Sequence, residues 1–366
     1  MRKIREWPKG SIYIDPLSKG CELCKKGAKL VLLVTGRCPA SCFYCPLSGR
    51  KRGKDVIYAD EWKLNNEKDT DKILEEAKLI EAEGAGITGG DPLLVWRRTL
   101  DYISLLKKNF GEDFHIHLYT SGLRNGEHIP DLVSGGLDEI RFHPLPEYWK
   151  DMENSPVRKS IDIALKEDVD TAIEIPVIPG MEEEIRKLIE WSDSRGVRWM
   201  NLNELEFSET NAEELLKRGF DVKDDISSAV CGSEELAISI IREASQRDLE
   251  MGLHYCSSSF KDAIQLRNRI RRRAKNVAKD FEVINEDGLL VKGVIESGSR
   301  NLVDILRTRY EIPENLIRFD EEKSRIEIAP WIIEEIAEDL RREGLECYIV
   351  EEYPTADRLE VERMPL

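Results

Sequence analysis

Three cysteines lie close together in the chain at a spacing suited to binding metal. Cys38, Cys42 and Cys45 form the pattern C-x3-C-x2-C. Thiolates at this spacing can hold three irons of one [4Fe–4S] cluster, which leaves the fourth iron open to an exogenous ligand. A zinc site usually takes four Cys or His ligands, and residues 46–114 contain neither. The pattern therefore predicts an iron–sulfur cluster, with a zinc knuckle as the alternative.

The segments around these cysteines predict a parallel α/β fold. Apolar runs typical of buried strands alternate with stretches of helical periodicity such as 70–84, 97–110 and 234–248. The apolar runs are 29–36, 85–90, 114–122, 138–144, 171–180, 199–207 and 249–256. Repetition of strand, loop and helix is the signature of a parallel sheet or barrel. The cysteines follow the first run, so we expect them at the C-terminal mouth of a partial barrel of six or so βα units.

The pattern changes near residue 280. Asp287-Gly288 between two apolar runs signals a β-hairpin. The elements expected after it are a helix at 300–310, a strand pair at 316–329, a helix at 331–342 and strands at 345–352 and 358–364. We therefore expect an irregular N-terminal segment (1–28), a barrel domain (29–279) and a small C-terminal α+β domain (280–366).

The cysteine pattern directly after the first strand, with Tyr44 before its third cysteine, resembles the radical S-adenosylmethionine (radical SAM) superfamily. The resemblance covers roughly residues 29–210. In that superfamily the three cysteines hold a [4Fe–4S] cluster, and the amino and carboxylate groups of SAM chelate the fourth iron. The reduced cluster passes one electron to the sulfonium, and the resulting 5′-deoxyadenosyl radical abstracts a hydrogen atom. The resemblance implies this chemistry and both cofactors here.

The resemblance also implies cofactor contacts at strand ends. Thr88-Gly89-Gly90-Asp91-Pro92 follows the second strand, where glycines let the backbone approach a ligand, and the motif's carbonyls and carboxylate would accept hydrogen bonds from the methionyl ammonium. Thr120 and Ser121 match positions that contact ribose or carboxylate in relatives, and Val177 and Ile178 belong to an apolar strand expected against adenine. His143 ends a strand at the expected mouth and is a further candidate contact. The full set is Tyr44, Gly89, Gly90, Asp91, Pro92, Thr120, Ser121, His143, Val177 and Ile178. A turn or structural role is the alternative for each.

The chain is also similar to archaeal proteins described as related to pyruvate formate-lyase activating enzyme. Such activases make a glycyl radical on a partner, and many are shorter. An appended domain could position a macromolecule, so we expect an RNA or protein substrate, with glycyl-radical activation as the alternative. A non-catalytic zinc or iron–sulfur protein is a third possibility. The reductive chemistry implies a low-potential electron donor of the ferredoxin or flavodoxin type.

Three further cysteines could form a second metal site. Cys21 and Cys24 form a C-x2-C half-site, and Cys256 ends the last apolar run of the barrel. Together they could hold a second Fe–S cluster or zinc, with Cys231 or His254 completing the set. Cys24 is expected near the bottom of the barrel and Cys256 near its top, so they meet only if the N-terminal segment folds over the open edge or if the strand of Cys256 is antiparallel. Alternatively, Cys256 is a catalytic thiol, as hydrogen donor or covalent anchor.

The composition limits the environment and the partners. The chain has 366 residues, 34% of them charged, and a net charge of −16. No run of 18 apolar residues and no N-terminal apolar stretch occurs, so we expect a cytoplasmic protein without membrane contact. The acidic balance disfavours bulk affinity for nucleic acid, although basic clusters at 50–54 and 267–275 leave a local anionic contact open. The scarcity of glutamine, limited to Gln246 and Gln265, resembles thermophile usage.

Overall fold

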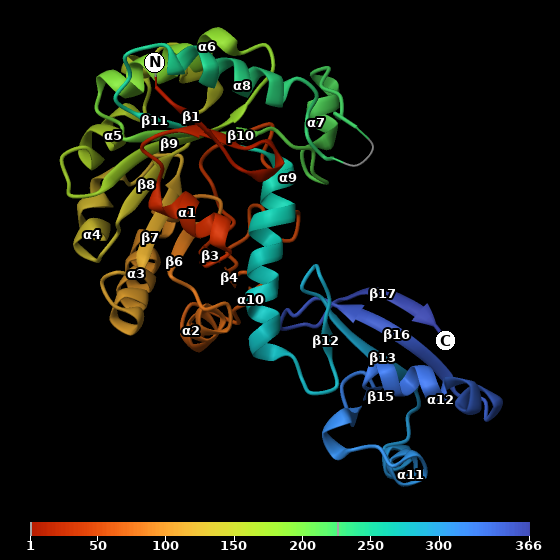
Figure 1. Ribbon diagram of the computed structural model, residues 1–366. Coiled ribbons are helices and arrows are strands. Elements are labelled where there is room, and N and C mark those ends of the chain that lie inside the picture. Colours follow the sequence, from red (N-terminus) through yellow and green to blue (C-terminus); the bar gives the residue numbers. More distant parts are fainter. Residues whose placement is uncertain (1, 225–226) are drawn as a thin grey trace. The chain divides into compact units, whose positions relative to one another are not determined.

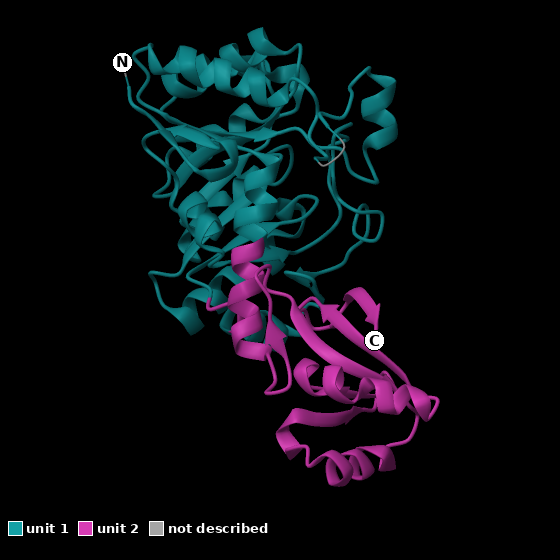
Figure 2. Cartoon of the chain, turned by 45° about the vertical axis from the view of Figure 1, so that its right-hand side comes forward, with its two compact units in different colours: residues 1–78, 82–266 teal, residues 79–81, 267–366 magenta. Residues whose placement is uncertain are grey.

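The computed structural model describes residues 2–224 and 227–366, and the chain forms two compact units (Figure 2). Unit 1 comprises residues 1–78 and 82–266, and unit 2 comprises residues 79–81 and 267–366. The sequence predicts a boundary at 279/280, and the difference is the helix α10 (Arg267–Val277). This helix binds segment 79–81 because Arg272 Nε donates to the carbonyl of Ile80 at 2.7 Å.

Unit 1 is built on an open sheet of eleven strands in the order β1-β2-β11-β10-β9-β8-β7-β6-β3-β4-β5 (Figure 1). The central strands run parallel to one another. They are β3 (Lys29–Leu33), β6 (Gly84–Thr88), β7 (His115–Thr120), β8 (Glu139–Phe142), β9 (Asp170–Val177), β10 (Trp199–Glu204) and β11 (Gly252–Cys256). Each overlaps one of the apolar runs, so the predicted partial parallel barrel is confirmed.

Amphipathic helices cover the outer face of this sheet (Figure 1). In α3 the buried positions Thr99, Tyr102, Ile103 and Leu106 recur at the spacing of one helix face. The helices between the strands are α2 (Thr70–Leu79), α3 (Trp96–Phe110), α4 (Ile129–Ser134), α5 (Arg158–Ala164), α6 (Glu182–Ser194), α7 (Ala212–Lys217) and α8 (Ser233–Ser245). With this outer layer in place, the inner face of the sheet is left to hold the functional side chains.

The N-terminal segment is ordered, and the expectation that residues 1–28 are irregular was wrong. β1 (Ile4–Glu6) and β2 (Ile12–Ile14) form a hairpin that adds antiparallel to the edge strand β11. The helix α1 (Lys19–Lys26) then packs against β3, β6 and β7 and ends at Gly27 in the left-handed conformation. Three-residue strands and an eight-residue helix carry too little periodicity to recognise, because tertiary packing supplies their stability.

Glycines let α1 approach the inner face of the sheet closely. A Cβ at Gly20 of α1 would lie 2.7 Å from Arg141 Nη2, and one at Gly84 of β6 would lie 2.7 Å from Leu23 Cδ1. Cys21 and Leu23 of α1 are both buried. The lower part of the barrel interior is therefore filled by α1, and the short antiparallel pair β4 (Tyr58–Ala59) and β5 (Trp62–Lys63) borders the opposite edge of the sheet.

After β11 the chain forms three consecutive helical segments. The short helix α9 (Ser258–Phe260) leads into a π-helical turn η6 (Lys261–Leu266), and α10 follows. The turn η6 packs against α1. π-helical turns are rare and occur frequently at functional sites, which draws attention to the neighbouring end of β11.

Unit 2 is an antiparallel sheet with two helices. The sheet order is β14-β15-β13-β16-β17, with β12 paired to β13. Its elements are β12 (Val283–Ile284), β13 (Leu290–Glu296), α11 (Asn301–Tyr310), β14 (Ile317–Asp320), β15 (Arg325–Ile328), α12 (Pro330–Arg342), β16 (Glu346–Glu352) and β17 (Glu360–Pro365). The hairpin, both helices and the strand pairs predicted for this region are confirmed. The core joins one sheet face to these helices and includes Cys347, which is 2% exposed.

Candidate active site

The cysteine loop leaves the C-terminal end of β3 and returns to it. Gly36 N–H donates to the carbonyl of Lys54 at 2.8 Å, and Gly53 N–H donates to the carbonyl of Gly36 at 2.8 Å. A Cβ at Gly36 would lie 1.7 Å from the carbonyl oxygen of Lys51, so only glycine fits this crossing. The loop is thereby closed at its base, and its cysteines lie at the mouth of the barrel.

The three thiols of this loop lie near one another. Cys38 is exposed, and Cys42 and Cys45 are half-buried. Desolvation, together with the neighbouring Asp91, Cys42 and Cys45, raises the pKa of the Cys38 thiol to about 12. The three sulfurs do not all lie within 4.8 Å of one another, whereas thiolates on one zinc ion at 2.3 Å would stand about 3.8 Å apart. The spacing fits a polynuclear cluster, whose ligands are spread over several irons.

His143, the residue after β8, supports the cysteine loop through Tyr44. His143 Nδ1 lies 2.7 Å from the carbonyl oxygen of Glu174 and therefore carries the ring proton. Its Nε2 then accepts a hydrogen bond from the Tyr44 hydroxyl at 2.9 Å. Burial lowers the pKa of His143, which keeps the ring neutral. Both ring nitrogens are thus engaged, and His143 lies against the loop as a buttress at the predicted mouth.

Two residues that the sequence analysis did not single out also hold the loop. Asn211 Nδ2 donates to the carbonyl of Tyr44 at 3.0 Å, and Thr210 Oγ1 donates to the carbonyl of Cys45 at 3.3 Å. Both follow β10 in the stretch Ser208–Ala212, and Asn211 is 1% exposed. Short polar residues just after a strand are a sequence signal for a loop that makes such contacts. The sequence could not show that Thr210 would contact Cys45, which lies 165 residues away.

The glycine motif packs backbone to backbone against the start of the cysteine loop. Gly90 N–H donates to the carbonyl of Thr35 at 2.7 Å, and Asp91 N–H donates to that of Arg37 at 2.7 Å. A Cβ at Gly90 would lie 2.1 Å from the Arg37 carbonyl oxygen, and Gly89 has φ +154° with Thr35 O at 2.2 Å from its Cβ position. The glycines are needed for this close approach, which places the motif beside the cysteines as predicted.

The Asp91 carboxylate is engaged by the protein itself. It is fully buried and accepts hydrogen bonds from Leu93 N–H at 3.0 Å, Thr120 Oγ1 at 2.7 Å, Ser121 N–H at 3.1 Å and the Ser121 hydroxyl. Burial raises its pKa, and these donors oppose the rise. The expected bond from this carboxylate to the methionyl ammonium stays a prediction. Asp91, Thr120 and Ser121 join the ends of β6 and β7 and fix the glycine backbone.

The predicted adenine strand lies in the sheet, but one side chain faces away from the interior. Glu174 of β9 points inward, so the alternation of a strand puts Val177 on the opposite face, beneath the helices. The carbonyl of Val177 accepts from Ser233 Oγ of α8 at 2.8 Å. Ile178 follows the strand end and is 2% exposed. The Val177 side chain is thus placed for packing, and the expected side-chain contact with adenine does not follow from this geometry. Pro92 is buried at the start of the turn η2 (Pro92–Val95).

The barrel interior carries a buried array of charged and amide side chains. Arg141 Nη1 lies 2.8 Å from Glu174 Oε2, and Asn201 and Asn203 donate to the two Glu174 oxygens at 2.9 Å each. Burial alone would raise the pKa of Glu174, but Arg141 and the amides outweigh it and hold the pKa at about 2. Glu174 is therefore an ionised carboxylate at neutral pH, below the mouth of the barrel.

The second group of cysteines converges on this interior. Cys21 Sγ of α1 lies 3.6 Å from Asn201 Oδ1 and 3.6 Å from Arg141 Nη2. Cys256 is buried at the end of β11, where its Sγ accepts from Gln265 Nε2 at 3.4 Å. β11 runs parallel to β10, which excludes the antiparallel alternative for the strand of Cys256. The N-terminal hairpin instead pairs with β11 through β2.

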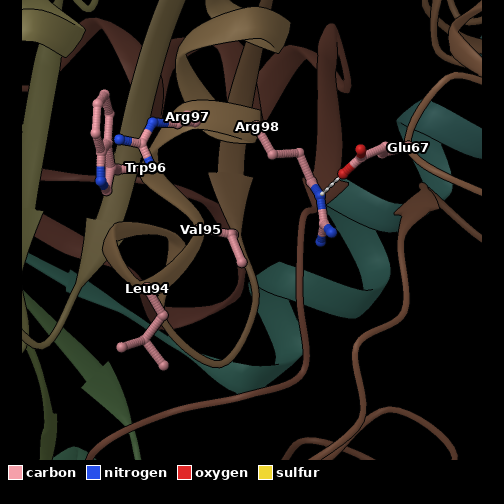
Figure 3. A pocket seen from close by; sticks show the side chains of 6 residues that line it. All are labelled: Glu67, Leu94, Val95, Trp96, Arg97 and Arg98. Atoms are coloured by element: carbon pink, nitrogen blue, oxygen red, sulfur yellow. Dashed lines mark hydrogen bonds and ion pairs between the residues drawn. The ribbon is translucent and has the colours of Figure 1, made fainter.

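A surface pocket lies beside the glycine motif but does not include the cysteines. Figure 3 shows its lining side chains, which are Glu67, Leu94, Val95, Trp96, Arg97 and Arg98. Arg98 Nε lies 3.2 Å from Glu67 Oε2. Its Nη1 donates to the carbonyl of Val34, the residue after β3. This arginine therefore anchors the outer side of the strand that leads into the cysteine loop.

Comparison with known proteins identifies the family. The profile of the radical SAM superfamily matches residues 32–192, and that of a domain of unknown function (DUF8061) matches residues 288–366. A Methanocaldococcus jannaschii protein named "Putative glycyl-radical enzyme activating enzyme" is 45% identical over 364 residues, which span 96% of this chain and 93% of the relative. The chain belongs to the radical SAM superfamily. The biotin synthase of Pseudoalteromonas translucida is 30% identical over 33% of this radical SAM chain and 34% of its own length.

Comparison with solved structures gives matches of low identity and low TM-score. The Streptococcus suis protein SuiB, solved bound to S-adenosylmethionine, aligns with a TM-score of 0.42 and 14% identity over 63% of this chain and 50% of SuiB. SuiB bound to the precursor peptide SuiA gives a TM-score of 0.44 over 65% of this chain and 51% of SuiB. The chain thus spans about half the length of SuiB.

As a radical SAM enzyme, the protein uses a [4Fe–4S] cluster and SAM, and the residues present fit both. The three neighbouring thiols at the end of β3 suit the cluster, and the glycines of the motif, which carry no side chains, lie directly against Thr35 and Arg37 before the first cysteine. When bound, the reduced cluster supplies the electron that cleaves SAM to methionine and a 5′-deoxyadenosyl radical. In the described part of the chain, no helix has both the length and the apolar character needed to cross a membrane.

Proposed function

We propose that the protein generates a radical on a glycine residue of a partner protein. The observation that carries this proposal is the relative from M. jannaschii, which is 45% identical over nearly the whole chain and is named for activation of a glycyl-radical enzyme. The match spans both compact units. The additional C-terminal unit is thus a feature that this chain shares with a relative named as an activase.

The position of α1 supports a substrate that is presented at the mouth of the barrel. α1 occupies the lower interior, where Ser18 Oγ lies 2.7 Å from Glu139 Oε2 and the Cβ position of Gly20 is 2.8 Å from His117 Nδ1. Arg141 and Glu174 form a buried ion pair in the same interior. A substrate therefore meets the cysteine loop from outside, as a flexible peptide segment of a protein can do.

The reaction also requires one electron for each SAM molecule that is cleaved. We include in the proposal a low-potential donor of the ferredoxin or flavodoxin type. The basic residues of the cysteine loop offer a contact for an acidic donor, since Arg50 and Arg52 lie on its surface-exposed return segment. Attraction between opposite charges would accelerate such an encounter and would weaken as salt increases.

Transfer of deuterium from glycine to the cofactor tests the proposed substrate. Protein and RNA fractions are prepared from native cells grown with [2,2-²H₂]glycine and incubated anaerobically with the reduced enzyme and unlabelled SAM. We expect 5′-deoxyadenosine carrying one deuterium with the protein fraction and none with the Cys38→Ala/Cys42→Ala/Cys45→Ala variant. Deuterium transfer from the RNA fraction alone, or unlabelled 5′-deoxyadenosine with both fractions, would contradict a protein glycine as the substrate.

A further inference from the structure

Cys21, Cys24 and Cys256 lie in one buried region of unit 1, apart from the cysteine loop. Cys21 contacts Asn201 of β10, and in the β10–β11 register His254 lies beside Asn201 and Cys256 beside Asn203. Gln265, the donor to Cys256, belongs to η6, which packs against α1, the helix of Cys21 and Cys24. The two cysteine-bearing elements therefore approach each other from two directions, through β10 and through η6.

All three thiols are at least partly shielded from solvent. Cys21 and Cys256 are buried, and Cys24 is half-buried. Cys21 and Cys24 lie one turn apart on α1, so their side chains share one face of this helix. Cys256 is 235 positions further along the chain than Cys21.

His254 adds a nitrogen ligand to this region. It stands two residues before Cys256 on the same face of β11 and is 3% exposed. Neither of its ring nitrogens has a hydrogen-bond partner within the described residues, which is a costly state for a buried imidazole. A neutral imidazole with a free lone pair is a common metal ligand.

Cations lie in the same region as these thiols. Arg141 Nη2 lies 3.6 Å from Cys21 Sγ. Lys261 is the first residue of η6, the turn that supplies Gln265 to Cys256. These cations reduce the cost of converting buried thiols to the thiolates that bind metal. The arrangement therefore suits an anionic metal–thiolate centre that would not be stable in an apolar interior.

We propose that Cys21, Cys24, Cys256 and His254 bind a second iron–sulfur cluster in the barrel interior. No three ligand atoms of this set lie within 4.8 Å of one another, a spacing that a single ion would require. An iron–sulfur cluster spreads its ligands over several irons and accepts the wider arrangement. Within the described residues, one set has its ligand atoms within 4.8 Å of one another, namely His115, His117 and Glu139. Lys29 lies beside His117 and Arg141 beside Glu139. These cations would repel a single metal ion, which, unlike an iron–sulfur cluster with thiolate ligands, carries a positive charge.

Metal analysis of the full-length protein, purified and reconstituted without oxygen, tests the second cluster independently of any substrate. With two [4Fe–4S] clusters we expect about eight irons per chain. The Cys38→Ala/Cys42→Ala/Cys45→Ala variant should retain about four irons and a cluster signal in electron paramagnetic resonance (EPR) after reduction with dithionite. The Cys24→Ala/Cys256→Ala variant should also retain about four, with the signal of the first cluster. Cys231→Ala/Cys347→Ala, the matched control, should keep about eight.

The same samples supply the results that would overturn the proposal. If the Cys38→Ala/Cys42→Ala/Cys45→Ala variant contained no iron but kept its circular dichroism spectrum, there would be no second cluster. If it contained one zinc per chain in place of four irons, the site would be mononuclear. The single variant Cys24→Ala alters a half-buried position and guards against misfolding of the double variant. In the triple-alanine background, His254→Gln should shift the EPR signal, and an unshifted signal would exclude His254 as a ligand.

Discussion

At the scale of single residues, Asp91 links the glycine motif to the end of β7. Its carboxylate gathers four donors from Leu93, Thr120 and Ser121, and its own N–H bonds to the carbonyl of Arg37 just before the first cysteine. The cysteine loop, the glycine motif and the third parallel strand therefore share one hydrogen-bonded junction. The sequence identified Asp91, Thr120 and Ser121, but it could not show that they bind one another.

Asp91→Ala should weaken SAM binding while leaving the first cluster in place. The substitution leaves the Thr120 and Ser121 donors without their acceptor and frees the glycine backbone to move. Loss of these charge-assisted hydrogen bonds within the protein costs on the order of 1.5–3 kcal/mol, so the SAM affinity should fall by at most roughly 150-fold. Anaerobic titration with SAM measures the effect, and iron analysis verifies the cluster. The matched control is Asp113→Ala, an exposed acid before β7. Unchanged affinity in an iron-loaded Asp91→Ala protein would mean that the motif is only a turn.

At the scale of elements, α1 is the feature that sequence patterns did not reveal. The long apolar runs identified every parallel strand, since burial on both faces makes such strands continuously hydrophobic. The hairpin β1–β2 and the helix α1 are too short for periodicity, and the close approach of α1 to the sheet depends on Gly20 of α1 and Gly84 of β6. Long-range contacts such as Asn211 to Tyr44 were equally inaccessible, because they depend on loops that meet only after the barrel has formed.

Gly20→Leu should destabilise unit 1 by expelling α1 from the barrel. The Cβ position of Gly20 already lies within 2.8 Å of Arg141 and His117, so a larger side chain has no space. Overpacking of this kind costs about 1–3 kcal/mol or more. Denaturant unfolding followed by circular dichroism should show the loss, and Gly298→Ala, where the added Cβ meets open space, should leave stability unchanged. Equal stability of the Gly20→Leu protein would show that α1 does not occupy the interior.

The sheet of unit 2 depends on a buried cation, and Lys292→Met should destabilise it. Lys292 Nζ lies 2.6 Å from Glu327 and 2.7 Å from Glu352, both with fully buried side chains. Removing one partner of a buried ion pair costs about 3–5 kcal/mol, because charges are left uncompensated. Hydrogen exchange with mass spectrometry should show faster exchange in β13, β15 and β16. Lys68→Met, an exposed lysine of unit 1, is the control, and unchanged exchange in unit 2 would contradict the network.

The same network predicts how unit 2 responds to acid. Burial would raise the pKa of Glu327, but Lys292 and then Arg318 outweigh it and lower the pKa to about 2. A carboxylate with a depressed pKa stabilises the folded state fully above its ordinary value of 4.5, and this contribution is lost as the pH falls toward 2. The protection of β15 amides, after correction for the pH dependence of intrinsic exchange, should therefore fall between pH 4.5 and 2 in the wild type, and much less in Lys292→Met. Parallel pH profiles in the two proteins would refute this assignment.

At the scale of the whole molecule, the chain combines a radical SAM unit with a separately packed α+β unit. The cysteine pattern predicts the superfamily and both cofactors, and the alternation of strands and helices predicts the parallel fold. All three predictions are confirmed. The substrate has no comparable signature, because it depends on surfaces rather than on spaced ligands. A protein glycine as the site of hydrogen abstraction is our proposal, and its central requirement is that this chain cleaves SAM reductively.

Formation of 5′-deoxyadenosine tests that requirement most directly. Wild-type protein, reconstituted with iron and sulfide and reduced with dithionite under anaerobic conditions, is incubated with SAM, and the products are measured by liquid chromatography and mass spectrometry. We expect equimolar 5′-deoxyadenosine and methionine from the wild type and neither product from the Cys38→Ala/Cys42→Ala/Cys45→Ala variant, which lacks the three iron ligands. Cleavage that persists in the variant, or no cleavage by an iron-loaded wild-type protein, would contradict the assignment of these cysteines and of the chemistry.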